Sequence, residues 1–453
     1  MLSRQKFAQI LGWVELLGVT LTICLLPVDR FPYLHHFPFR LGAISFVLLL
    51  VAATARFGKI ITDGRWQDFK RIVFVGLLLA LPVLGYAQSI HYAINRGLAT
   101  SATKLLLIVA LKALFFFILV YENPGLWKVI KKTIYVVTAL VVGFGFFQFI
   151  FDVLGASPKI TDLGSCCTSN STYIFPRVHS TALEPLYLDN YLMLPIWLLT
   201  FDFLSSKKNR ANKYLIGLFV GSGVLFILTI ARSAILALMF AAVIFYFGIK
   251  GQKAIKGFLL HMARLWGLAV IVAIVLVAMS GVASTFIPKH PINGSNAGVA
   301  GSVELFSSHA LAVTDASSQT RYSIWPKSIG FIEKHPLKGV GAYNSRVELN
   351  LDKYNKGADP ATLQPFNNDL IGLLVDLGLL GVATFGPLVA LLIYLIYRLF
   401  KKHWSNDAAP MALVLIAMLI QSNFFHSILL ARLWVVVGLL LCSFRYESQK
   451  KRA

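Results

Sequence analysis

Long apolar segments recur along the whole chain, and they constrain its fold more than any other feature. About 20 apolar residues in a helix cross the hydrocarbon core of a bilayer, and runs near this length alternate with polar loops throughout the sequence. Hydrophobic residues make up 57% of the 453 residues, and charged residues only 14%. A helix satisfies its backbone hydrogen bonds within each span. The sequence therefore predicts an all-α, polytopic membrane protein.

We expect about 12 transmembrane helices. The segment from Asn367 to Phe400 is too long for one upright helix, and Gly378, Gly381 and Pro387 favour a break or bend within it, so we expect one tilted or kinked crossing there. The first apolar run lacks a small-residue cleavage site after it and is expected to be the first span rather than a signal peptide. The expected spans are approximately 11–28, 41–57, 72–87, 104–121, 133–155, 184–204, 214–230, 232–249, 266–287, 368–400, 411–425 and 428–443.

The net charge of +22 is distributed as membrane topology requires, not as nucleic-acid binding would require. Lys and Arg gather in short loops at alternating ends of the spans, which predicts that both termini are cytoplasmic. Three regions follow from this topology. Residues 1–287 hold the first nine spans and an external segment at 156–183, residues 288–367 form one large external loop, and residues 368–453 hold the last three spans and a cytoplasmic tail.

The large external loop is expected to contain a short helix. Trp325, Ile329 and Ile332 follow a helical period, and Pro326 suits a first turn, so residues 321–334 are predicted to be helical. The sequence HPLKGVG, which includes Pro336, is expected to end this helix in a tight turn, whereas the preceding residues 288–318 are rich in Gly, Ser, Ala and Asn and are expected to be irregular.

Motifs for nucleotide or metal chemistry are missing from the sequence. It contains no GxxxxGK[ST] loop, no GxGxxG after a strand and no GxSxG elbow. Its four cysteines, Cys24, Cys166, Cys167 and Cys442, have no metal-ligand spacing. We therefore expect no cofactor and no metal, and we expect the energy for any reaction to come from the substrate or from a gradient.

Three arginines are expected at the outer ends of the spans: Arg177, Arg232 and Arg321. Arginine binds phosphate through two parallel hydrogen bonds and stays charged when desolvated. Arg232 joins two spans with almost no loop, so it either snorkels at a hairpin tip or awaits an anion between helices. Three such residues on one side of the membrane indicate a lipid-linked phosphate or diphosphate as substrate.

Candidate acid–base residues lie near these arginines. His179 and Glu184 precede the sixth span, where Thr181 and Glu184 have the spacing of a capping box and Pro185 suits the first turn. Capping explains Glu184 alone but not the whole group. Before the tenth span, Asn367 and Asn368 are candidates for helix capping. Asp376 in the same span lies seven residues after Asp369, on the same helical face about 10 Å away, where one carboxylate could pair with an arginine.

Several of these residues occur in an order that resembles the conserved region of the O-antigen polymerase and ligase family. The pattern reads RYSIW…IEKHPLKGVGAYNS…FNNDLIGLLVDLGLLGV. Arg232-Ser233 resembles the SR hairpin of the family, and Arg177 with Glu184-Pro185 resembles the R…EP segment common among polymerases. The matching positions in the large loop and the following helix are Arg321, Trp325, Pro336, Gly339, Gly341, Asn367, Asn368, Asp376, Gly378 and Gly381.

The resemblance implies a glycosyltransferase of the bacterial cytoplasmic membrane. Its donor would be a glycan on undecaprenyl diphosphate, attacked with inversion by a sugar hydroxyl on a second lipid-linked unit, without metal or nucleotide. The arginines would bind the diphosphate, and membrane lipid would surround the chain. A chain-length regulator is a possible protein partner, and no nucleic-acid partner is expected.

The family's ligases carry a histidine, considered as a general base, where this chain has Asn367, which cannot take a proton. The departure favours a polymerase and shifts the base to Glu184, His179 or Asp376. The alternatives are ligation of a finished glycan to a lipid or protein and transport of an anionic lipid or solute.

Overall fold

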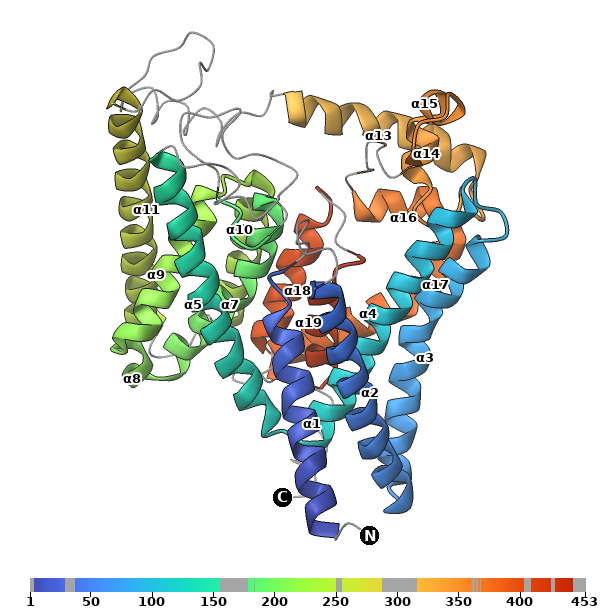
Figure 1. Ribbon diagram of the computed structural model, residues 1–453, viewed down its shortest axis with the longest axis horizontal. Coiled ribbons are helices and arrows are strands. Elements are labelled where there is room, and N and C mark those ends of the chain that lie inside the picture. The colour runs from blue at the N-terminus through green and yellow to red at the C-terminus, as the bar shows by residue number, and fades with distance from the viewer. Residues whose placement is uncertain are drawn as a thin grey trace. The chain divides into compact units, whose positions relative to one another are not determined.

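The computed structural model describes residues 4–28, 37–154, 178–182, 184–249, 255–286, 316–360, 363, 366, 368–402, 409–424 and 428–442. These residues form helices and connecting turns, without a strand among them (Figure 1). The helices are α1 (Arg4–Cys24), α2 (Phe37–Thr62), α3 (Trp66–Ser89), α4 (Arg96–Glu122), α5 (Leu126–Val153), α7 (Pro185–Ser205), α8 (Lys207–Arg210), α9 (Lys213–Leu228), α10 (Arg232–Ile249), α11 (Ile255–Phe286), α13 (Ala316–Lys334), α14 (Ser345–Leu349), α15 (Leu351–Asn355), α16 (Asp369–Leu377), α17 (Leu379–Lys402), α18 (Ala409–Gln421) and α19 (Ala431–Leu441).

The helices have the composition and surface of a polytopic membrane protein. Within the described ranges, 6 helices are long and apolar enough to cross a bilayer, and further apolar helices are shorter. Large apolar side chains stand exposed on several of them: Leu77 is 62% exposed, Leu140 70% and Phe247 66%. Exposed apolar surface on this scale is typical of helices that face lipid. A helix lies at each expected span, and the number of membrane crossings remains a prediction.

The chain divides into two compact units. The first unit comprises Met1–Glu15, Leu49–Pro124 and Val313–Ala453, and the second comprises Leu16–Leu48 and Gly125–Ala312. In the first unit, α4 packs along both α3 and α19, and α17 packs along α3. Gly438 of α19 allows this close approach, because a Cβ there would lie 2.4 Å from the carbonyl oxygen of Ala113 in α4.

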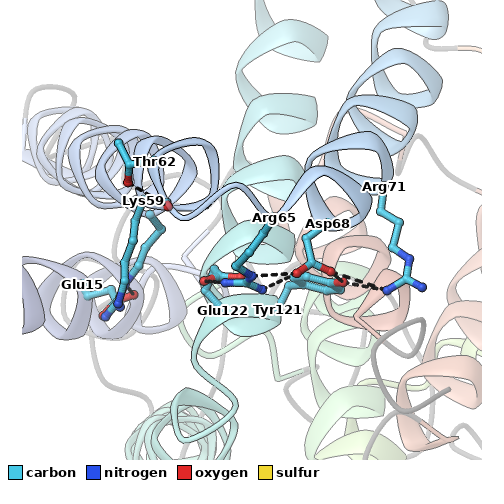
Figure 2. Close-up of polar contacts among 9 residues, drawn as sticks. Glu15, Lys59, Thr62, Arg65, Asp68, Arg71, Tyr121 and Glu122 are labelled. Carbon is cyan, nitrogen blue, oxygen red and sulfur yellow. Dashed lines mark hydrogen bonds and ion pairs between the residues drawn. The ribbon is translucent and has the colours of Figure 1, made fainter. Parts of the chain in front are cut away.

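A charged network closes one end of the α3–α4 pair in the first unit (Figure 2). Arg65, in the turn before α3, bonds both Asp68 and Glu122, with Nη1 2.8 Å from the Glu122 carboxylate. The Tyr121 hydroxyl donates to Asp68 at 2.5 Å and accepts from Arg71 at 3.0 Å. The network links α3, α4 and the turn from α2, and the bond to Glu122 raises the pKa of Arg65. Ionic groups at a helix end pair with one another here, so they need no separate functional explanation.

In the second unit, α9 is the central helix, because α5, α7 and α11 all contact it. Its residues are apolar on every side, which is the pattern of a helix buried by its neighbours. A Cβ at Gly221 would lie 2.8 Å from a Val142 methyl group, and one at Gly223 would lie 3.1 Å from the Ala269 Cβ. These glycines allow α5 and α11 to approach α9 closely.

The helix expected in the large loop is present but longer than predicted. Figure 1 shows α13 together with α14, α15 and α16, and α13 packs on α14 and α16 through a core of Ile324, Val340, Phe366 and Val375. The helix begins at Ala316, so Pro326 lies inside it and not in its first turn. Packing of this apolar face outweighs the local cost of an interior proline, about 3 kcal/mol.

The break or bend expected in this segment is a complete break of the helix at Gly378. Helix α16 ends at Leu377, Gly378 adopts φ 57° and ψ −143°, and α17 begins at the next residue. This backbone conformation is essentially restricted to glycine. Pro387, which was expected to contribute to a bend, lies within α17. The segment 368–400 therefore consists of two helices joined at Gly378, and its path across the membrane remains a prediction.

Candidate functional site

The candidate residues fall into both units of the chain. Arg177 and Asn367 lie outside the described residues, and the structure describes only the helical backbone, within α13, of Arg321 and Trp325. His179, Glu184 and Arg232 belong to the second unit. The remaining candidates belong to the first unit: Pro336, Gly339, Gly341, Asn368 and Asp376.

The turn after α13 is interlocked with the break between α16 and α17. The carbonyl oxygens of Pro336 and Leu337 accept hydrogen bonds from the first two amides of α17, at 2.9 and 3.1 Å. A Cβ at Gly378 would lie 2.5 Å from the Pro336 oxygen, and a Cβ at Gly339 would lie 2.3 Å from the backbone carbonyl carbon of Asp376. Both glycines have positive φ, 57° and 65°. The Pro-x-x-Gly turn and the Gly378 break therefore form one backbone assembly, which we call the turn platform (residues 336–346 with 375–380).

The turn platform is also attached to the connection between α3 and α4. Gly341 has φ 101°, and a Cβ there would lie 2.4 Å from the Cβ of Ala93. The amide of Ala342 donates to the Ser89 hydroxyl at 2.9 Å. The Asn344 side chain bonds both backbone groups of Asn95, accepting from its amide at 2.6 Å and donating to its carbonyl at 3.2 Å. These contacts fix the platform from two sides.

Asp376 holds the platform through its side chain. Its two carboxylate oxygens accept backbone hydrogen bonds from Tyr343 at 2.8 Å and from Ser345 at 2.6 Å, and the residue is 2% exposed. Tyr343 has φ 61°, which costs a bulky residue on the order of 1–3 kcal/mol unless its surroundings hold it. The carboxylate supplies that restraint. This geometry favours a positioning function for Asp376 over proton transfer.

The charge of Asp376 also affects the pKa of a tyrosine beside the turn platform. Tyr92 lies in the turn between α3 and α4. Burial raises the pKa of its phenol to about 12, and the charge of Asp376 adds to the shift. Tyr92 therefore keeps its proton over the physiological pH range, so its hydroxyl remains able to donate a hydrogen bond.

Asn368 caps α16, as the sequence predicted. Its side-chain oxygen accepts from the Ile371 amide at 2.9 Å, and its backbone is extended. The next residue, Asp369, accepts from the Ile428 amide at 3.0 Å and donates its own amide to Ser422 at 2.9 Å. The start of α16 is thus connected to the segment between α18 and α19.

His179 is enclosed in a hydrogen-bond network within the second unit. It is 1% exposed; its Nδ1 lies 3.1 Å from the Ala182 carbonyl and its Nε2 lies 2.7 Å from the Gln148 side-chain nitrogen. The Gln148 oxygen accepts from the amides of His179 and Ser180, at 3.2 and 2.9 Å. This orientation leaves the Gln148 NH₂ to donate to Nε2, so we assign the neutral tautomer protonated on Nδ1. Both ring nitrogens are used, which favours a structural function for His179.

Glu184 differs from the capping box that the sequence suggested. It is itself the N-cap residue, Pro185 is the first residue of α7, and no side-chain capping bond forms. Thr181 instead donates to the Pro27 carbonyl at 3.2 Å. The local reason is Pro185, which suits the first helical position and lets the helix start there. Glu184 is partly exposed, and its side chain forms no capping bond.

Arg232 begins α10 directly after a three-residue connection from α9. The connection contains Ile230 with φ 54° and Thr229, whose hydroxyl donates to the Asp189 carboxylate of α7 at 2.6 Å. Asp189 is fully buried and lies five residues after Glu184. The structure therefore brings the start of α7, with Glu184, and the tip that carries Arg232 into one region of the second unit.

Sequence reasoning missed two buried arginines of the first unit. Arg432, near the start of α19, is 1% exposed, and Arg346 in α14 is 9% exposed. A signal for Arg432 was present, because an ionisable residue at the edge of an apolar run is a functional candidate. Arg346 follows the motif turn in a polar sequence, where nothing local distinguishes it from a solvated surface arginine.

Comparison with protein families gives one match. Residues 217–386 match the family model described as O-antigen ligase. The matched range covers Arg232, Arg321 and the turn platform. No protein of curated function matches the chain.

Proposed function

Because the chain belongs to the O-antigen polymerase and ligase family, we propose that it joins lipid-linked glycan units into a polysaccharide. Its apolar helices and its family indicate an integral membrane protein of the bacterial envelope. The observation that carries the proposal is the family match over residues 217–386. We further propose that both termini are cytoplasmic, that residues 156–183 and 288–367 are external, and that the reaction takes place on the outer face of the membrane.

The proposed reaction is an inverting glycosyl transfer. A hydroxyl oxygen of the acceptor sugar forms a bond to the anomeric carbon of the donor glycan. The bond from that carbon to the diphosphate oxygen breaks, and the electron pair leaves with the polyprenyl diphosphate. Arg177, Arg232 and Arg321 would stabilise the charge that grows on the leaving group, and the hydroxyl proton would pass to Glu184.

The polymerase is favoured over the ligase by two positions. Asn367 stands where the family's ligases carry a histidine, and the Arg177…Glu184-Pro185 segment resembles the polymerases. We favour Glu184 as the base, because Asp376 binds two backbone amides and both ring nitrogens of His179 have partners.

Purified protein in lipid nanodiscs, supplied with a lipid-linked repeat unit from the native organism, tests the proposal. A polymerase produces a ladder of glycans on the lipid and releases polyprenyl diphosphate. A ligase consumes the glycan only when a separate lipid or protein acceptor is added. Unchanged glycan that crosses the bilayer of a proteoliposome would support a transporter and contradict the proposed reaction.

Variants test the proposed residues in the same assay. Arg232→Ala and Arg321→Ala each remove a charge-assisted contact worth roughly 1.5–3 kcal/mol, and lysine should restore little because the planar fork is lost. Arg264→Ala, an exposed arginine of α11, is the matched control. Normal ladders from both alanine variants would remove these arginines from the mechanism.

Glu184→Gln separates capping from catalysis. The side chain forms no capping bond, so we expect normal expression and a loss of about 10²- to 10⁴-fold in rate, the usual range for a lost acid–base group. Glu333→Gln, exposed on α13, is the control. An active Glu184→Gln enzyme would show that Glu184 is not the base.

A further inference from the structure

Arg346 is a buried arginine that forms no ion pair with a carboxylate among the residues that the structure describes. It lies in α14 and is 9% exposed, and none of the ion pairs among the described residues involves it. Its guanidinium carbon lies 4.4 Å from the centroid of the Tyr343 ring, and Nη2 donates to the Tyr343 hydroxyl at 3.0 Å. Its Nε is enclosed and has no hydrogen-bond partner. Within the described part of the chain, the guanidinium therefore keeps donor capacity that no hydrogen bond uses.

Burial of this kind needs an explanation. Charged side chains are almost never buried unless they are paired, because desolvation is costly. A purely structural arginine in such a place normally uses its donors on carboxylates or backbone carbonyls. Stacking on an aromatic ring leaves the planar fork oriented for a flat or tetrahedral oxyanion. The arrangement of Arg346 on Tyr343 is that of a prepared anion receptor.

Other groups at the turn platform also have unused donors among the described residues. The hydroxyl groups of Ser345 and Tyr92 are likewise enclosed without a hydrogen-bond partner. Both hydroxyls can donate a hydrogen bond, as can the Nε of Arg346. A ligand rich in hydrogen-bond acceptors would suit these unpaired donors at the turn platform. The ammonium of Lys338 lies 6.0 Å from the centroid of the Tyr92 ring and adds positive charge to the same platform.

The turn platform also contains a strained residue, Tyr343, which its surroundings hold in place. Tyr343, the ring on which Arg346 stacks, has φ 61° and is restrained by the Asp376 carboxylate. Strained residues that the surrounding structure over-determines cluster at ligand-binding sites. Asp376 and the glycine turn would thus serve to present the stacked pair in one fixed orientation.

We propose that Arg346, stacked on Tyr343, is an oxyanion-binding subsite for the lipid-linked glycan. The ligand group is a phosphate or carboxylate oxyanion, supplied either by the lipid diphosphate or by an acidic sugar of the glycan. This inference rests on the proposed function for the identity of the ligand. Arg346 binds and orients in this scheme and takes no part in proton transfer.

Binding measured without turnover tests the subsite. Farnesyl diphosphate, which carries no sugar, and a glucuronate oligosaccharide, which carries no phosphate, are titrated separately into the full-length protein in detergent. The variants are Arg346→Gln, which removes the charge, and Arg346→Lys, which keeps the charge but loses the stacked fork. Lys353→Gln is the matched control, because Lys353 is an exposed cation of the neighbouring α15. Thermal unfolding is recorded for every variant.

We expect Arg346→Gln to weaken one probe by about 10- to 100-fold, the effect of one lost charge-assisted contact. Loss confined to farnesyl diphosphate assigns the diphosphate to the subsite, and loss confined to the oligosaccharide assigns an acidic sugar. Arg346→Lys should recover only part of the affinity while unfolding like the parent. Unchanged affinity for both probes in Arg346→Gln, or equal weakening in Lys353→Gln, overturns the inference. Because no product is measured, this result stands whether or not the protein proves to be a polymerase.

Discussion

Replacement of Asp376 by asparagine distinguishes a positioning carboxylate from a catalytic base. The two amides that the carboxylate binds, those of Tyr343 and Ser345, belong to one turn and lie 2.8 and 2.6 Å away. Asparagine offers one oxygen and one NH₂ group. It can therefore keep one of the two bonds, and its NH₂ group then faces the other amide, donor against donor.

The expected cost follows from these contacts. One charge-assisted hydrogen bond is lost, worth about 1.5–3 kcal/mol, and one buried amide is left without an acceptor, at about 1–3 kcal/mol. The strain at Tyr343, roughly 1–3 kcal/mol, also loses its restraint. The two lost contacts lower the local stability of the turn platform by about 2.5–6 kcal/mol, and release of the strain at Tyr343 further favours opening of the segment from Gly339 to Ser345.

Limited proteolysis and hydrogen exchange over residues 336–346 measure this opening, and polymer formation is assayed in parallel. Faster exchange at Tyr343 and Ser345 together with reduced polymer is the expected result. Asp352→Asn, exposed on α15, should change neither. A variant with parental exchange and a rate lowered by a factor of about 10² or more would refute the positioning function and return Asp376 to the list of possible bases.

Three further outcomes follow from the described contacts. Gly378→Ala should destabilise the protein by more than about 2 kcal/mol, because its Cβ would lie 2.5 Å from a backbone oxygen at a positive φ; Gly386→Ala, with open space around it, should be silent in the same thermal unfolding assay. Gln148→Leu should cost about 2–4 kcal/mol, because two buried amides lose their acceptor; equal thermal stability would show that this network is dispensable. Lys353→Cys should react with an impermeant thiol reagent in intact cells, and labelling only after permeabilisation would contradict an external loop at 288–367.

The sequence alone predicted the class of fold and the position of most helices. Apolar runs are a local property, and their length is set by the bilayer, so the spans can be located without knowledge of the packing. The cap at Asn368 was predicted for the same reason, since its side chain bonds an amide only three residues away. The family resemblance was also visible in the sequence, because the motif order around Arg321, Pro336 and Asp376 is linear.

Other features depended on neighbours that are distant in sequence. The break falls at Gly378 because this residue must fit against the turn after α13, some 40 residues earlier in the sequence, and no local signal reports that contact. The start of α13 was placed five residues too late, at 321, whereas the helix begins at Ala316. The capping box at Glu184 was wrong because the helix begins at Pro185 and Thr181 bonds Pro27 instead.

The functions of the polar candidates were decided by tertiary contacts. His179 and Asp376 have the side chains of general bases, and nothing in the sequence separates them from Glu184. Only the fold shows that Gln148 is hydrogen-bonded to the His179 ring and that two backbone amides donate to the Asp376 carboxylate. The same holds for Arg346. Its sequence context is that of a solvated arginine, whereas in the structure it is buried against Tyr343. The charge and hydrogen-bonding groups of a side chain follow from the residue type. Whether those groups bind other protein atoms or remain available to a ligand depends on which atoms the folded chain places beside the side chain.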